Sequence, residues 1–152
     1  IPSSVAIIPV DLWLYMEAFG TSAQFECNAV IGTGGSLTSG GTARTPVNVR
    51  SDLTGGSSVT WTQGGNTIVA VGSTANINRF WHDGKQFAIT KTAESATVSS
   101  FDPVKFKWSA KDTGAIHIAA PSSQLAIHQG SQAGTGFAGL TYVELPSSWL
   151  PT

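Results

Sequence analysis

Histidine and carboxylate side chains are the groups in this sequence most able to do acid, base or metal chemistry. The 152 residues include three histidines, His82, His117 and His128. Imidazole is the side chain that ordinarily exchanges protons between pH 5 and 8, and it is a common metal ligand. His117 and His128 lie between apolar residues in short alternating stretches, and no HExxH, GxSxG, P-loop or Cys/His cluster accompanies them. We therefore expect no metal site, no cofactor and no catalytic histidine.

Paired carboxylates would suit glycoside hydrolysis. Four aspartates lie in turn-like stretches that contain Gly, Pro or Thr: Asp52, Asp83, Asp102 and Asp112. Aspartates in turns usually accept hydrogen bonds from their own backbone. We therefore expect the protein not to be an enzyme, and a hydrolase whose carboxylates meet only in the folded chain is the third interpretation in rank.

Residues 79–85 (RFWHDGK) bring aromatic, imidazole, acidic and basic groups around Asp83-Gly84, which the sequence predicts to be a tight turn. An exposed Trp81, with His82 and Asp83 beside it, would be suited to grip a sugar or a protein surface. A hairpin with Phe80 or Trp81 in the core is the favoured interpretation. Trp61 leaves the same two interpretations open. The candidate binding residues are thus Trp61, Trp81, His82 and Asp83.

Composition excludes several classes of partner. The net charge is −1 and only 11% of the residues are charged, so we expect no basic surface for nucleic acid. The longest apolar stretch, residues 5–19, contains Pro9, Asp11 and Glu17, so we expect no membrane-spanning segment. The single cysteine, Cys27, lies in an alternating stretch and is expected to be buried.

A period of two in hydrophobicity is the strongest structural signal. Gly, Ser and Thr make up about a third of the chain, which favours strands and turns over helices. Residues 11–19 satisfy helical spacing as well, but Pro9 and Gly20 favour a long core strand. The other predicted strands are 24–31, 57–62, 67–71, 87–90, 96–99, 104–108, 116–118, 125–128 and 139–145, with a hairpin at Gly64-Gly65. We predict an all-β, jelly-roll-like sandwich of about eight to ten strands.

The length predicts one domain, residues 1–145, followed by a Pro- and Trp-containing tail, residues 146–152. The tail holds two prolines and two large apolar residues, Trp149 and Leu150. Exposing both apolar side chains would be unfavourable, so we expect the tail to pack on this subunit or on a neighbour. Trp149 and Leu150 are therefore candidate assembly residues.

Residues 38–49 (TSGGTARTPVNV) resemble a GGTaxTPxN pattern of small virion proteins of tailed bacteriophages, of the head-decoration or fibre-tip type. The stretches 125–128 and 136–145 are similar to the closing strands of these proteins and of tumour-necrosis-factor/C1q-like jelly rolls. The resemblance covers part of the chain and does not account for the tail. It implies that Pro46 and Asn48 shape a loop and that the closing strand runs near a threefold axis.

From the resemblance and the low charge we expect a bacteriophage capsid-decoration or head-fibre subunit on the exterior of the virion. Its expected partners are copies of itself, as a homotrimer, and other capsid or virion proteins. The alternative function is a carbohydrate- or receptor-binding tip module of a viral fibre, which would add a host-surface glycan as a partner.

Overall fold

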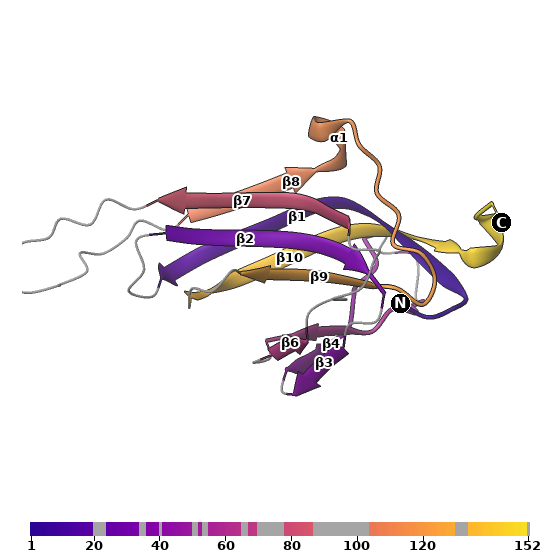
Figure 1. Cartoon of the computed structure of the whole chain (residues 1–152). Coiled ribbons are helices and arrows are strands. Elements are labelled where there is room, and N and C mark those ends of the chain that lie inside the picture. Colours follow the sequence, from indigo (N-terminus) through magenta and orange to yellow (C-terminus); the bar gives the residue numbers. More distant parts are fainter. Residues whose placement is uncertain are drawn as a thin grey trace, which may run out of the picture.

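Alternating apolar and polar residues form an antiparallel β-sandwich (Figure 1). The computed structural model describes residues 1–19, 24–33, 36–39, 41–49, 52, 55–64, 67–69, 78–86, 104–129 and 134–151. Its elements are β1 (Val5–Phe19), β2 (Gln24–Gly32), β3 (Ser36–Ser39), β4 (Thr42–Arg44), β5 (Trp61–Gln63), β6 (Thr67–Val69), β7 (Asn78–Gln86), β8 (Val104–Ser109), α1 (Ala110–Thr113), β9 (Gln124–Gln129), β10 (Gly134–Pro146) and the 3-10 turn η1 (Ser147–Trp149). The all-β prediction is confirmed.

The strand pairs are nested along the chain. One sheet has the order β10-β1-β8 and the other β7-β2-β9, with two smaller pairs, β3-β6 and β4-β5. The β4-β5 pair lies within β3-β6, which lies within β2-β7, which in turn lies within β1-β8. Strands β9 and β10 then add to the free sides of β2 and β1. This nesting of antiparallel pairs across two sheets is the pairing of a jelly roll.

The core lies between the two three-stranded sheets. Its larger cluster takes alternate residues of β1 and β2 together with aromatic residues of β7 and β8: Leu12, Met16, Phe25, Cys27, Ala29, Trp81, Phe106 and Trp108. The rings of Phe25 and Phe106 stack with centroids 5.6 Å apart. A second cluster near the chain termini contains Ile7, Ile31, Val59 and Ala119. The expected burial of Cys27 is confirmed.

Strand β1 pairs on both sides, with β10 and with β8. A helix over residues 11–19 could not form these two ladders, so the strand prediction is correct there. Bulges follow Pro9 and Met16 in the pairing with β10. Pro9 cannot donate a backbone hydrogen bond, and prolines within sheets are confined to irregular or edge positions, so a bulge beside it is expected.

The predicted turn at Asp83-Gly84 is wrong, because both residues lie inside β7. Gly84 pairs with Glu26, and an added Cβ at Gly84 would lie 2.8 Å from the backbone oxygen of Phe25. Glycine is needed there because the neighbouring backbone approaches closely, and that need resembles a turn signal in sequence.

Gly84→Val is expected to lower the free energy of unfolding by about 1–3 kcal/mol, because the new side chain must displace backbone rather than a flexible side chain. Urea denaturation followed by circular dichroism measures the loss. Gly55→Val is the matched control, since a Cβ at Gly55 meets no atom within 4 Å. Equal midpoints for the two variants would contradict the close approach.

Three other local predictions differ from the structure. Residues 116–118 form no strand: Ile116 and Ile118 are exposed, and the neighbouring Ala119 makes only an isolated bridge to Ile7. The predicted strand 57–62 is reduced to β5, because the backbone amides of Ser58 and Val59 donate to side chains, those of Glu144 and Ser57, and not to a neighbouring strand. The hairpin at Gly64 does not form, because β5 pairs with β4 and β6 pairs with β3. The predicted strands 87–90 and 96–99, and residues 70–71, lie outside the described residues.

Both termini lie at the same end of the sandwich, and the C-terminal turn projects beyond it (Figure 1). The last strand runs to Pro146, where the tail was predicted to begin, and η1 follows. A hydrogen bond of 2.8 Å from the Ser147 amide to the Ser4 carbonyl holds the start of the tail. Trp149 is 72% exposed and Leu150 is half-buried, so Trp149 does not pack on its own subunit.

Candidate functional site: an aromatic sheet face and an apolar groove

The four predicted binding residues do not come together. Trp81 is 7% exposed and belongs to the larger core cluster, so it cannot contact a partner and its binding role is corrected to a packing role. His82 is exposed and Asp83 half-buried on β7, at the edge of the β7-β2-β9 sheet. Trp61 lies on β5 and contacts Tyr142 of β10, which belongs to the other large sheet. The aromatic, imidazole and acid predicted as one grip are thus dispersed.

Trp61 takes part in a chain of hydrogen bonds that fastens residues 57–61 to β10. Its Nε1 donates to the Tyr142 hydroxyl at 3.1 Å, and the two rings lie 5.5 Å apart. The Tyr142 hydroxyl donates to Ser57 Oγ at 2.7 Å, and Ser57 Oγ donates to Glu144 Oε2 at 2.7 Å. Each of these three donors, the Trp61 indole and the Tyr142 and Ser57 hydroxyls, has an acceptor within the hydrogen-bond series.

Glu144 ends this chain of hydrogen bonds. Burial alone would raise the pKa of its carboxyl, but hydrogen bonds from the Ser57 hydroxyl and the Ser58 amide favour the charged form and leave the pKa below its ordinary value. A carboxylate with a lowered pKa stabilises the fold above its unfolded pKa and loses that contribution as the pH falls through the folded value. The attachment of residues 57–61 is therefore intact at neutral pH.

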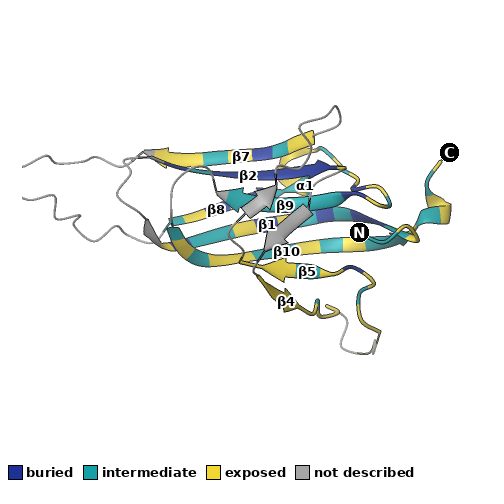
Figure 2. Ribbon diagram, turned by 60° about the horizontal axis from the view of Figure 1, so that its bottom comes forward, coloured by how far each residue is buried: buried dark blue, intermediate teal, exposed yellow. Residues whose placement is uncertain are grey.

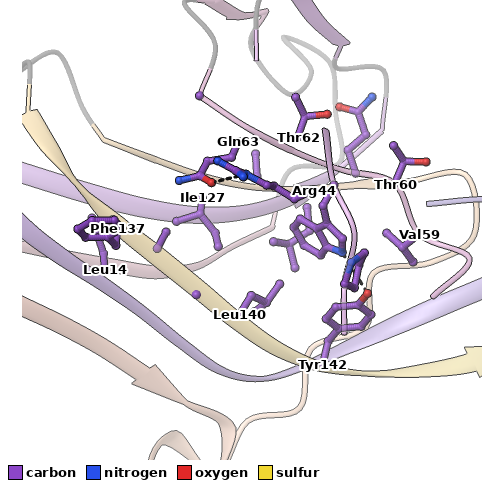
Figure 3. Close-up of a pocket in the computed structure, with 18 of the residues that line it drawn as sticks. Leu14, Arg44, Val59, Thr60, Thr62, Gln63, Ile127, Phe137, Leu140 and Tyr142 are labelled. Carbon is purple, nitrogen blue, oxygen red and sulfur yellow. Dashed lines mark hydrogen bonds between the residues drawn. The ribbon is translucent and has the colours of Figure 1, made fainter. Parts of the chain in front are cut away.

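An apolar groove of about 690 Å³ lies between the β4-β5 pair and the two edge strands β9 and β10. Figure 3 shows Leu140, Ile127 and Tyr142 at its floor and sides, and Arg44 donating to Gln63 Oε1 at 2.8 Å. Gly136, which has no side chain, and Ala138, which has a small one, also line the groove on β10. Among its described lining residues there is no Asp, Glu, His or Cys, the groups that carry most general acid–base chemistry.

The outward face of the β10-β1-β8 sheet carries exposed aromatic residues. In β1 the core takes Leu12 and Met16, so Trp13 and Tyr15 point outward. Tyr15 pairs directly with Phe137 of β10 and with Lys105 of β8, and Trp13 pairs with Gly139 and Lys107. Trp13 is 37% and Phe137 53% exposed. We call the surface formed by Trp13, Tyr15, Phe137, Val143, Lys105 and Lys107 the aromatic face.

Trp13 is held in place by its neighbours on the aromatic face. A Cβ added at Gly139 would overlap Cε2 of Trp13, so the indole lies directly against the glycine backbone. The ammonium nitrogen of Lys105 lies 5.3 Å from the indole centroid, a distance that suits a cation–π contact. Trp13 is thus a fixed aromatic surface.

The sequence analysis missed the aromatic face. Once residues 11–19 are a strand, alternation with Leu12 and Met16 places Trp13 and Tyr15 on the outside, so the signal was present. That Phe137 lies beside Tyr15 depends on the β1-β10 register. Two bulges shift this register, and no local sequence pattern reveals it. Figure 2 shows β10 alternating between half-buried and exposed residues.

Neither the Cys27 thiol nor the His117 imidazole forms a reactive centre. Burial, followed by the charge of Asp83, raises the pKa of Cys27 to about 12, so its thiolate is suppressed. His117 packs against Phe80 and Trp108 at centroid distances of 5.0 and 5.9 Å, with its Nδ1 3.1 Å from Asn78 Nδ2. His117 is therefore a packing residue.

In the described part of the chain, no three His, Cys, Asp or Glu side chains gather as a metal site. No helix among the same residues is long and apolar enough to span a bilayer. No protein-family model, curated protein or solved structure matches the chain.

Proposed function

We propose that this protein is a structural subunit of a bacteriophage particle, a capsid-decoration or head-fibre protein that assembles as a homotrimer on the exterior of the virion and is not an enzyme. The observation that carries the proposal is the aromatic face. Three aromatic side chains stand together on one exposed sheet surface of a sandwich in which only 11% of residues are charged.

Self-association is the use that best suits the aromatic face. Aromatic residues are enriched at protein interfaces, and a weakly charged monomer that exposes them has little to oppose association. The face also carries charges of both signs, since Lys105 and Lys107 on β8 lie beside a β1 strand that exposes Asp11 and Glu17. A second copy can therefore match it in charge as well as in hydrophobicity.

The trimer follows from the resemblance to small virion proteins, which implies that the closing strand runs near a threefold axis. The closing strand here is β10, and it contributes Phe137 and Val143 to the aromatic face. A threefold axis beside β10 would bring three copies of these side chains together. The exposed Trp149 on η1 then remains available for other capsid or virion proteins.

The alternative function, a carbohydrate- or receptor-binding tip, is favoured by a different observation. The groove combines the aromatic pair Trp61 and Tyr142 with the polar groups of Arg44 and Gln63, a mixture that suits a sugar ring and its hydroxyls. Binding to a glycan array that is lost in Trp61→Ala would favour this function. An array without signal would remove it.

The expected solution state is a trimer of about three times the 15.8 kDa chain mass at micromolar concentration. Size-exclusion chromatography with light scattering measures the mass. Mass spectrometry of purified phage particles that encode the chain should find it in stoichiometric amount, whereas a free lectin or hydrolase would be absent. A stable monomer, or particles without the protein, would overturn the proposal.

A further inference from the structure

Two histidines flank one asparagine across the sheet β7-β2-β9. Asn28 of the central strand β2 pairs directly with His82 of β7 on one side and with His128 of β9 on the other. Directly opposed residues of antiparallel strands point to the same face, with Cβ atoms about 5 Å apart. The neighbours of Asn28 on β2, Cys27 and Ala29, point into the core. The three side chains therefore stand in a row on the outer face of this sheet.

The amide oxygen of Asn28 is buried and has no hydrogen-bond partner. The residue is 7% exposed, and Oδ1 is a buried acceptor without a donor. Leaving a buried polar atom unpaired costs about 1–3 kcal/mol, and such atoms are rare in folded proteins. An apolar residue would avoid that cost on this part of β2, where residues 27–32 are all buried (Figure 2). The unpaired oxygen indicates a bound group that can satisfy it, either a hydrogen-bond donor or a cation.

We propose that His82, Asn28 and His128 bind a divalent transition-metal ion on the outer face of the β7-β2-β9 sheet. Imidazole nitrogen suits zinc, copper and nickel, and a metal ion is an electron-pair acceptor that Asn28 Oδ1 can satisfy. The pairing register places one histidine on each side of Asn28, on the two neighbouring strands. Each ligand comes from a different strand, so the ion would link all three strands of the sheet.

The local backbone and the exposure of the row fit such a site. A bulge between Ala29 and Val30 in the β2-β7 pairing adjoins the row, and bulges commonly re-aim side chains beside functional sites. His82 is exposed, so an ion can enter from solvent, and His128 and Asn28 are more enclosed. Three protein ligands leave at least one coordination position for water, which is the arrangement of an open site.

The test uses the full chain without a histidine tag. Isothermal titration with zinc chloride, and the visible absorption spectrum after addition of cobalt chloride, should both show one site per chain. His82→Gln and His128→Gln should each weaken zinc binding at least about tenfold. His117→Gln is the matched control, because it removes a histidine that packs against Phe80 and Trp108 away from the row, and it should bind as the wild type does.

Asn28→Asp separates a role of the oxygen from a role of the histidines alone. A carboxylate at this position keeps the oxygen and adds a negative charge, so zinc should bind more tightly and should raise the melting temperature of this variant more than that of the wild type. Absence of a one-to-one site in the wild type would overturn the proposal. Equal loss in the His117 control, or no loss in His82→Gln and His128→Gln, would overturn it as well.

Discussion

Trp81→Ala is expected to lower the free energy of unfolding by about 3–5 kcal/mol, because removal of a buried indole leaves a large cavity. Trp81 lies opposite Ala29 on the inward side of β7, and the small alanine leaves room for its ring. Whole domains are usually stable by about 5–15 kcal/mol, so this single change would remove a large share of the total. Chemical denaturation followed by far-ultraviolet circular dichroism measures the loss.

Trp149→Ala is the control for Trp81→Ala, since the same truncation is made at an exposed position. It should change the unfolding free energy by no more than about 0.5 kcal/mol. Trp81→Phe should recover most of the stability that Trp81→Ala loses, because a ring refills much of the cavity. A Trp81→Ala variant as stable as the wild type would contradict the packing role and restore Trp81 as a contact residue.

The all-β architecture was predictable because core and outer-face residues alternate along its long strands. In β2 the core positions Phe25, Cys27 and Ala29 alternate with residues of the outer face, and this gives the strand without any partner. The segment 11–19 was harder, since Leu12 and Met16 also satisfy helical spacing. Its two flanking ladders, which form only in three dimensions, decide the outcome.

Glycine was the main source of wrong local predictions. A glycine can serve positive φ, as Gly64 and Gly114 do, or close approach of backbones, as Gly84 and Gly136 do. The residue type is identical in both cases, and only the neighbouring strand distinguishes them. The predicted turn at Asp83-Gly84 failed for this reason. The predicted hairpin at Gly64 failed for a different one: Gly64 does have a positive φ, but the strands on either side of it pair with β4 and β3 instead of with each other.

The candidate sites depend on register rather than on motif, which limits what the sequence reveals. Tyr15 and Phe137 are more than a hundred residues apart and meet because β1 and β10 pair with two bulges between them. Asn28 and its two histidines come from three separate strands. Such cross-strand rows have no fixed spacing along the chain, unlike a helix motif, so a search for spaced motifs passes over them.

Phe137→Ser and Trp13→Ser are each expected to dissociate the proposed trimer while the fold is retained. Truncating an aromatic residue at the centre of an interface typically costs about 2 kcal/mol or more of binding free energy. For each contact this raises the dissociation constant about 30-fold. Phe137 is half-exposed in the subunit, so its removal should affect folding far less than Trp81→Ala does. Sedimentation velocity over a concentration series measures the change in assembly.

Val47→Ser is the control for these two substitutions, because Val47 is a strongly exposed apolar residue outside the aromatic face. It should leave the sedimentation profile unchanged, since the aromatic face and not surface hydrophobicity in general is proposed to drive assembly. Circular dichroism melts of Phe137→Ser and Val47→Ser should be alike at concentrations where both are monomeric. A trimer that survives both Phe137→Ser and Trp13→Ser would show that another surface joins the subunits, and the exposed Trp149 on η1 would then be the next residue to replace.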